Sequence, residues 1–259
     1  MIAETNSSAI HYDVAGDGDA LVLISGLGGL GAFWKPVVPL LAERFRVVTL
    51  DHPGVGKSST REGQTIPGIA EAVLAVMDRE RIQTAHFVGH STGSLVAQTL
   101  ALDYTSRCER VVLSGGWARV DKRFRDLFAF RRFLLETNGV AAYNALSRIG
   151  GYDGRWYSEN LASDSAPDFS AEQEADVATI VKRLDMLLGY ERVADLAALH
   201  KDVLVIGAAD DFIVPFYNSE DLVRLIPAAE LKQLDGGHFF PQVHPKAFAM
   251  CVTSFLERK

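Results

Sequence analysis

The sequence predicts an α/β fold in which a mostly parallel sheet has helices on both faces and a helical insertion. Three observations predict it. Short runs that are apolar throughout recur along the chain, as expected for strands covered on both faces. Helical periodicity lies between most of them, as expected for parallel strands joined by crossover helices. One long interval contains helical patterns alone, which indicates an insertion between two strands.

The expected strands each end at a glycine, proline or polar residue. They lie at residues 21–24, 46–50, 85–88, 111–113, 203–206 and 230–234. Residues 66–80 are expected to form a crossover helix, because Ile69, Val73, Val76 and Met77 share one side of it. The order of strands and helices is therefore that of an open, parallel sheet.

No apolar run typical of a strand is found between about Trp117 and Leu196. Helical patterns cover 121–136 and 172–188, residues 150–154 break the first pattern, and 163–168 are typical of a loop. We therefore expect one core domain formed by residues 1–116 and 196–259, with a helical cap formed by residues 117–195.

Composition limits the classes of function. The 259 residues are 48% hydrophobic and carry 26 basic against 33 acidic side chains, a net charge of −7 that argues against nucleic acid as the partner. No apolar run approaches 18 residues, so no membrane span is expected. The first four residues lack the basic and apolar regions of a signal peptide, which favours the cytoplasm. Cys108 and Cys251 match neither a metal site nor a disulfide framework, so no metal is expected.

One five-residue motif has the pattern of a nucleophile elbow. Residues 89–93 read Gly-His-Ser-Thr-Gly, between the strand expected at 85–88 and the helix expected at 95–100. A sharp turn there would hold Ser91 in a strained conformation with its hydroxyl exposed. The glycines at both ends would let the strand and the helix pass closely. We therefore expect Ser91 to be the catalytic nucleophile.

A serine hydroxyl needs a base to become a good nucleophile. His238 is the candidate, because it follows the last expected strand and two glycines, where sites in open α/β sheets gather. The loop after strand 203–206 offers Asp210 and Asp211, either of which could orient the imidazole. An oxyanion hole also needs backbone N–H donors, which we assign to Leu27, after the first expected strand, and to Thr92.

These residues resemble the α/β-hydrolase family over essentially the whole chain. The supporting motifs are Ser25–Gly28, Asp51–Ser58, the Ser91 elbow, Asp211–Pro215 and Gly237-His238. The chain order serine, aspartate, histidine is that of the family. The resemblance selects Asp211 over Asp210, because the family's acid usually lies four residues before such a proline. Many members have histidine where this chain has Ser25, but the expected donor in that loop is a backbone amide.

The expected cap is the candidate source of substrate selectivity. Its first part, residues 117–134, holds six basic and two acidic residues, so one arginine could pair with a substrate carboxylate. A solvated helix face would explain the same charges. Three segments, Leu23–Gly29, Leu102–Tyr104 and Gly115–Trp117, also resemble aminoacrylate hydrolases of pyrimidine breakdown and 3-oxoadipate enol-lactone hydrolases, which act on small carboxylates. The candidate substrate-binding residues are Gly26, Trp117, Phe124, Phe128, Arg131, Trp156 and Phe239.

Two glycine-rich segments suggest nucleotide binding and have to be weighed. Residues 26–31 fit G-x-G-x-x-G, and Asp51 ends the next strand, as in a dinucleotide fingerprint. However, Pro36 and Pro39 fall where the phosphate-binding helix would run. Residues 54–58 end like a phosphate loop, but Asp51 stands where its first glycine is required. No cofactor is therefore expected.

The sequence thus predicts a cofactor-free serine hydrolase with the triad Ser91, Asp211 and His238. Its substrate would be a small ester, lactone, amide or enamine, or a carbon–carbon substrate, that carries a carboxylate. Three alternatives stay open: an aminoacrylate-type hydrolase, a lyase or perhydrolase that uses the same triad, and a ligand-binding receptor with a vestigial triad. We expect a monomer or homodimer, whose partner is the small-molecule substrate, with no membrane or nucleic acid bound.

Overall fold

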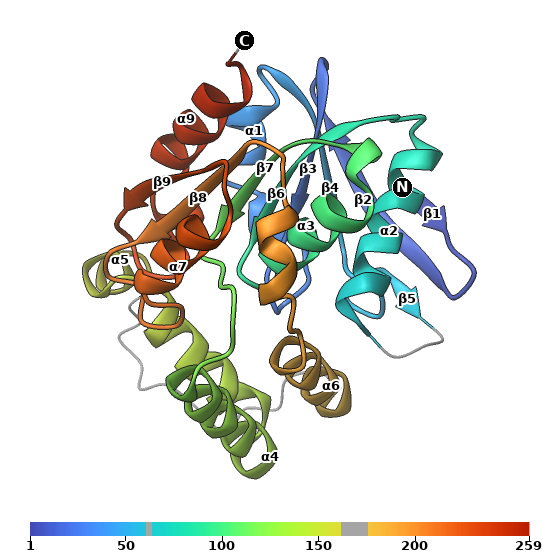
Figure 1. Ribbon diagram of the computed structural model, residues 1–259. Helices are drawn as coiled ribbons and strands as arrows, with labels where there is room; N and C mark the ends of the chain where they lie inside the picture. Colours follow the sequence, from blue (N-terminus) through green and yellow to red (C-terminus); the bar gives the residue numbers. More distant parts are fainter. Residues whose placement is uncertain (61–63, 162–175, 259) are drawn as a thin grey trace.

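The computed structural model describes residues 1–60, 64–161 and 176–258. These residues form a nine-stranded sheet (Figure 1). In spatial order its strands are β1 (Ile2–Glu4), β2 (Ser8–Ala15), β4 (Phe45–Leu50), β3 (Asp19–Ile24), β6 (Ala85–His90), β7 (Cys108–Ser114), β8 (Val203–Ala208) and β9 (Ala229–Leu234), and β5 (Ser59–Thr60) pairs with β2.

All strand pairs from β4 to β9 are parallel, which confirms the predicted fold class. The six expected strands correspond to β3, β4, β6, β7, β8 and β9. The antiparallel strands β1 and β2 at one edge were not predicted. In β2 buried residues alternate with more exposed ones, the pattern of a strand near a sheet edge, so its sequence lacks the continuous apolar run that marked the others.

Two layers of helices bury the two faces of the sheet. Alternate residues of β3 take opposite sides: Leu21 and Leu23 belong to one core cluster, and Val22 and Ile24 to the other. The first cluster includes residues of α1 (Val38–Leu41) or its flanks and of α9 (Pro245–Leu256). The second includes residues of α2 (Ile66–Arg79), α3 (Thr92–Asp103) and α7 (Tyr217–Leu225).

The strand order changes direction between β3 and β6. After β3 the chain passes to β4 on one side, and β6 then pairs with β3 on the other. The loops that follow β3 and β6 therefore leave the same edge of the sheet next to each other, the arrangement in which open α/β sheets place their ligand sites. The elbow at Ser91 and the glycine-rich loop Ser25–Gly29 are these two loops.

Between β7 and β8 the described residues contain helices and no strand. They are α4 (Lys122–Gly151), α5 (Gly154–Asn160) and α6 (Val177–Leu188), which we call the insertion; Figure 1 shows α4 and α6 together below the sheet. The expected loop at 163–168 and the start of the helix expected at 172–188 lie outside the described residues. No helix in the described parts of the chain is long and apolar enough to cross a membrane.

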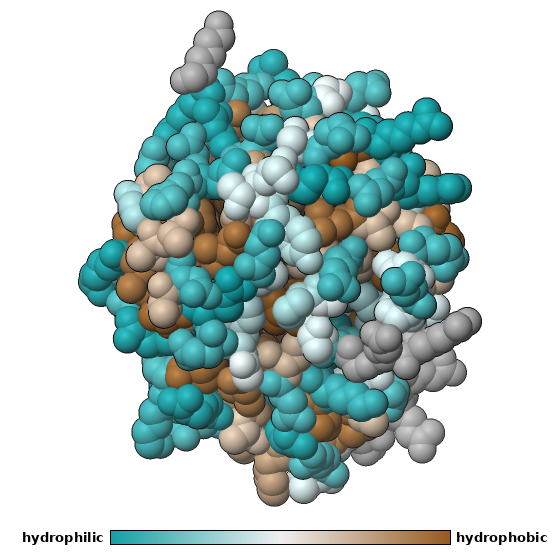
Figure 2. All heavy atoms as spheres, turned by 45° about the vertical axis from the view of Figure 1, so that its right-hand side comes forward, coloured by the Kyte–Doolittle hydropathy of each residue, from teal (hydrophilic) through white to brown (hydrophobic). Residues whose placement is uncertain are grey.

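One face of the molecule is predominantly polar. Figure 2 shows one face on which hydrophilic side chains predominate and hydrophobic ones form small, scattered groups. The net charge of −7 is consistent with this distribution.

Helix α4 is two helices joined at Gly139. Gly139 has φ +80° and ψ −177°, a backbone conformation that is essentially restricted to glycine, and a Cβ at this position would meet no atom within 4 Å. The break lies just after the helix expected at 121–136 and separates it from the second helix of α4, which ends at Gly151. The requirement for glycine here comes from the backbone alone.

We expect Gly139→Ala to lower the free energy of unfolding by about 1–3 kcal/mol, the cost of forcing a side chain into this conformation. Urea denaturation measures the change. Gly154→Ala is the matched control, since Gly154 also has open space around its Cβ position but begins a regular helix. That variant should be neutral or slightly stabilising, and an equal loss in both variants would contradict the explanation.

Candidate active site

The turn between β6 and α3 holds Ser91 in a strained conformation. Ser91 has φ 54° and ψ −121°, and the strain is sustained by a hydrogen bond from its N–H to the carbonyl oxygen of Ser114 in β7, at 2.8 Å. A side chain at either end of the turn would clash with the neighbouring backbone and prevent this conformation. A Cβ on Gly89 would lie 2.1 Å from the carbonyl oxygen of Gly93, and one on Gly93 would lie 2.2 Å from that of Ile24. The two glycines of the motif therefore permit the close passage of strand and helix.

Three side chains from three different loops form one hydrogen-bonded line. His238 Nε2 lies 2.9 Å from Ser91 Oγ, and His238 Nδ1 lies 2.7 Å from Asp211 Oδ2. The aspartate and histidine side chains are buried, at 0% and 4% exposure. The carboxylate accepts the Nδ1 proton, which leaves Nε2 free to accept from the serine hydroxyl. The arrangement can increase the nucleophilicity of Ser91.

The structure distinguishes the two aspartates of the loop after β8, of which the resemblance to the family selected Asp211. Asp211 contacts His238, and its second oxygen accepts the N–H of Val214 at 2.8 Å. Asp210 is exposed and instead accepts the N–H of Gly236 at 3.0 Å, which anchors the loop that leads to His238. One aspartate thus orients the imidazole, and its neighbour holds the loop that carries it.

The imidazole of His238 has to reach from the end of β9 toward the end of β6, past β7. Gly115, directly after β7, leaves room for it with φ +53°. A Cβ at this position would lie 3.4 Å from Cε1 of His238 and 3.2 Å from Cε1 of His90. A larger residue at 115 would therefore crowd both rings.

The two N–H groups expected to bind an oxyanion flank Ser91. Thr92 is the first residue of α3, and its N–H has no acceptor among the described residues. The N–H of Leu27 likewise has no acceptor in this part of the chain. Gly26, just before Leu27, approaches the nucleophile so closely that its Cβ would lie 3.1 Å from Ser91 Cβ. Both donors are thus available beside the serine.

A second histidine is buried beside the first. The ring of His90 lies 5.0 Å from that of His238 and stacks on Phe33 at 4.9 Å, and its Nδ1 is 3.0 Å from Ser114 Oγ. Burial, and the proximity of His238, hold the pKa of His90 well below its usual value. His90 is therefore neutral, and its ring packs against that of His238 without placing a second positive charge beside it.

A cavity of about 800 Å³ opens above Ser91 and His238. Four of the seven expected substrate-binding residues line it: Gly26, Phe128, Arg131 and Phe239. The other three do not. Trp117 and Phe124 are buried in the core with their rings 4.7 Å apart, and Trp156 stacks on Tyr152 at 4.4 Å. Aromatic residues at helical spacing satisfy core packing as well as a binding site, so the sequence could not separate the two.

Of the six basic residues at 117–134, only Arg131 reaches the cavity. Its guanidinium donates to Tyr143 Oη at 2.9 Å and to Ser147 Oγ at 2.8 Å, and it lies 4.8 Å from the ring centre of Phe128. Its Nε is buried without an acceptor, and burial lowers its pKa. No carboxylate among the described residues pairs with it. Arg131 therefore presents a positive charge to the cavity without a carboxylate paired to it.

A second buried arginine, Arg183 of α6, also lines the cavity and was not predicted. The sequence analysis considered only the basic residues before 135. A signal was present: Arg183 is three residues after Ile180 and four before Leu187, on the apolar side of α6. A charged residue at such a position is a candidate for a buried functional group.

The fold does not build a dinucleotide site on the glycine-rich loop after β3. A dinucleotide fingerprint needs a helix whose N-terminus starts at the loop. Here the loop is followed by a single 3₁₀ turn, Gly31–Trp34, and by the four-residue α1, which contains Pro39. The glycines instead allow the loop to approach Ser91 and Arg183.

Comparison with known proteins agrees with this fold. The family model described as the alpha/beta hydrolase fold matches residues 19–245. A Caulobacter vibrioides protein that carries the name carbamate hydrolase RutD is 35% identical, with 96% of this chain and 95% of the relative covered. A Pantoea ananatis protein of the same name is 31% identical over 96% and 94% of the two chains.

Among solved structures, the enol-lactonase from Burkholderia xenovorans LB400 superimposes with a TM-score of 0.89 at 25% identity, and both chains are covered completely. The family match spans most of the chain, and the relatives span nearly all of it. The chain therefore belongs to the α/β-hydrolase family and is a hydrolase.

Proposed function

We propose that this chain is a serine hydrolase that cleaves a small acyl substrate with a carboxylate group. The single observation that carries the proposal is the hydrogen-bonded line Ser91–His238–Asp211 at the floor of a cavity with a buried, unpaired arginine. The relatives support it, because carbamates and enol-lactones both contain an acyl carbon bonded to a heteroatom that can leave.

The mechanism follows from the positions of the donors and acceptors. Ser91 Oγ attacks the acyl carbon while His238 Nε2 takes its proton, and Asp211 stabilises the imidazolium that forms. The N–H groups of Leu27 and Thr92 bind the oxyanion. His238 then protonates the leaving oxygen or nitrogen, and the acyl-enzyme remains. Water enters, gives a proton to His238 and releases the acid, and the proton returns to Ser91.

We propose that the insertion is a cap over this centre, with residues 117–195 as the cap and residues 1–116 and 196–259 as the core. Arg131 and Phe128 of α4 and Ile180 and Arg183 of α6 reach the cavity from the insertion, and Ser91 and His238 reach it from the sheet. The insertion thus supplies the wall of the cavity that contacts the substrate away from its scissile bond. Contacts with this part of the substrate determine selectivity.

The charge of the cavity supports a substrate with a carboxylate. A guanidinium suits such a group because its planar donors match two oxygens. The acidic residue that lines the described part of the cavity, Asp176, already accepts from the N–H of Ala178 at 3.0 Å and from Thr179 Oγ1 at 2.6 Å. Asp176 forms no ion pair with Arg131. An ester, lactone or carbamate of a small acid fits these conditions best.

We expect Ser91→Ala to lower kcat by about 10⁴-fold or more, because the covalent step loses its nucleophile. Steady-state kinetics measure the change, with the esters, enol-lactones and carbamates of small acids as substrates. A fluorophosphonate should label Ser91, as mass spectrometry of the digested protein would show. Ser94→Ala is the matched control, since Ser94 is a buried serine one turn later in α3 whose hydroxyl makes no hydrogen bond. Full activity of Ser91→Ala would eliminate covalent catalysis and favour a receptor or another use of the fold.

We expect Arg131→Met to lower kcat/KM about 10- to 100-fold for an ester with a carboxylate on its acyl chain, since a charge-assisted contact is lost. The para-nitrophenyl monoester of succinate is one such substrate. The para-nitrophenyl ester of butyrate lacks the carboxylate and should be hydrolysed almost as before. Arg125→Met removes an exposed arginine of the same helix and is the matched control. An equal loss of kcat/KM on both esters would mean that Arg131 supports the fold of the insertion and does not bind the substrate carboxylate.

A further inference from the structure

We propose that Arg183, which belongs to the insertion, is a positioning residue. It holds the loop that contains Leu27 in the conformation in which the Leu27 N–H can bind the oxyanion. This inference rests on the proposed function, since it assigns a task to the loop only if Ser91 forms an oxyanion. It makes α6 part of the catalytic apparatus without contact to the reacting atoms.

The loop that Arg183 holds is a tight turn. The N–H of Gly29 donates to the carbonyl oxygen of Gly26 at 2.9 Å, so residues 26–29 form a hydrogen-bonded β-turn. The peptide that contains Gly26 O also contains the N–H of Leu27, on its opposite side because the peptide is trans. Fixing this turn therefore fixes the direction of the proposed oxyanion donor.

Arg183 binds the one peptide of the turn that the turn itself leaves free. Its Nε donates to the carbonyl oxygen of Leu27 at 2.6 Å. This carbonyl belongs to the central peptide, whose orientation distinguishes one turn type from another. A flip of this peptide changes ψ of Leu27, and a change to a primed turn type also reverses φ of Leu27 and so reorients the backbone around its N–H. The guanidinium thus selects one of the conformations that the loop could adopt.

The guanidinium also packs directly on the turn. Gly29 has φ +72°, and a Cβ there would lie 2.7 Å from Nη2 of Arg183. The N–H of His52 donates to the carbonyl oxygen of Gly29 at 2.8 Å, which ties the end of the turn to the segment after β4. The loop is therefore enclosed between the core on one side and Arg183 on the other.

The remaining partners of Arg183 are neutral. Its Nη2 lies 3.0 Å from Nδ1 of His52, and its Nη1 donates to Oε1 of Gln64. Burial, together with the charge of Arg183, keeps the pKa of His52 well below its usual value, so His52 is neutral and accepts at Nδ1. None of the described carboxylates forms an ion pair with Arg183.

A buried cation without a counter-charge is unfavourable for folding. Arg183 is 2% exposed, and burial lowers its pKa to about 10, so it remains charged at neutral pH. An apolar residue would fill the same place on the apolar side of α6 without this desolvation cost. The arrangement therefore suggests a task beyond stability, and the bond to Leu27 O is the contact that only a donor of this reach provides.

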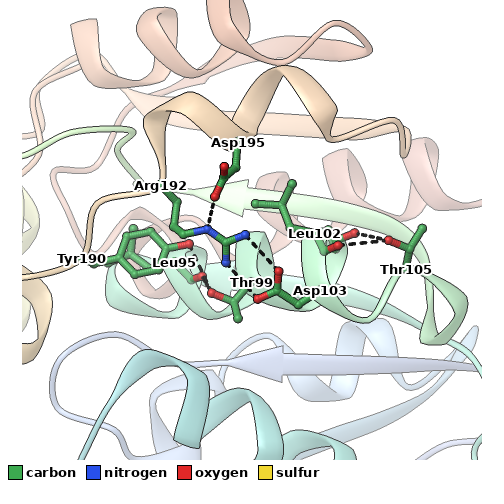
Figure 3. Close-up of polar contacts among 9 residues, drawn as sticks. Leu95, Thr99, Leu102, Asp103, Thr105, Tyr190, Arg192 and Asp195 are labelled. Carbon is green, nitrogen blue, oxygen red and sulfur yellow. Dashed lines mark hydrogen bonds and ion pairs between the residues drawn. The ribbon is translucent and has the colours of Figure 1, made fainter.

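Helix α6 is itself fixed to the core just after its C-terminus. Figure 3 shows Arg192 between Asp103 at the end of α3 and Asp195, with Tyr190 beside Thr99. Arg192 donates to both oxygens of Asp103, at 2.8 and 2.9 Å, and the hydroxyls of Tyr190 and Thr99 are 3.2 Å apart. These contacts attach the insertion to the helix that starts at the nucleophile, but none of them touches the oxyanion loop.

The test compares Arg183→Met and Arg183→Lys with Arg192→Met. The substrate is the para-nitrophenyl ester of butyrate, whose acyl chain has no carboxylate. We measure kcat, KM, the rate and final stoichiometry of fluorophosphonate labelling, and the melting temperature. Arg183→Met should lose about 10- to 100-fold in kcat and in labelling rate, with KM nearly unchanged, because the oxyanion donor is misplaced. Arg183→Lys should lose about three- to tenfold, since one ammonium cannot hold all three acceptors.

The control separates positioning from attachment of the insertion. Arg192→Met should lower the melting temperature and leave kcat close to that of the wild type. Equal losses of kcat in Arg183→Met and Arg192→Met would overturn the proposal in favour of simple attachment. Should Arg183→Met fail to fold, Arg183→Lys decides, and an unchanged kcat in that variant overturns the proposal.

Two further outcomes identify other roles. A rise in KM for the succinate monoester alone, with kcat retained for both esters, would make Arg183 a substrate-binding residue and overturn its positioning role. Absence of labelling and turnover in the wild type would overturn the proposed function itself. The two failures are thus distinguishable, because the second appears before any Arg183 variant is made.

Discussion

The site depends on the close passage of β6 and α3 beneath Ser91. Its positive φ is held by the hydrogen bond to Ser114 O and by two glycines that admit no Cβ. Gly93 touches the end of β3, so the same contact that strains the elbow also sets the distance from the elbow to the loop after β3. The nucleophile and the proposed oxyanion donor are therefore placed by one packing constraint, and the strain is distributed over three adjacent strands.

From this constraint the rest of the site follows by strand order. Because β7 lies between β6 and β8, the imidazole on the loop after β9 has to cross the end of β7, which Gly115 permits. The acid on the loop after β8 then lies beside the histidine, not beside the serine. The three residues are far apart in sequence, yet the parallel sheet brings all their loops to one edge.

The sequence predicted those parts of the structure that short motifs encode. The six buried strands are continuous apolar runs, and the elbow carries its own glycines, so both could be recognised locally. Strand β2, next to the edge of the sheet, alternates in burial and was missed. The cavity walls were harder, because Phe124 and Phe128 have the same helical pattern, and only the crossing of α4 over the core decides which one faces the cavity. Arg183 depends on the contact of α6 with a loop more than 150 residues earlier, which no local pattern contains.

The two buried arginines differ in how many of their guanidinium nitrogens already have a protein acceptor, and this difference indicates their roles. Arg131 gives Nη2 to Tyr143 and Ser147, and the described residues offer no acceptor to its Nε or Nη1, so hydrogen-bonding capacity and charge both remain for a ligand. Arg183 uses all three nitrogens on protein acceptors. Only a ligand that took Nε would displace the Leu27 carbonyl oxygen, and it would thereby loosen the donor that the reaction needs. Arg131 is therefore suited to bind the substrate and Arg183 to position the loop that contains Leu27, although both line the same cavity.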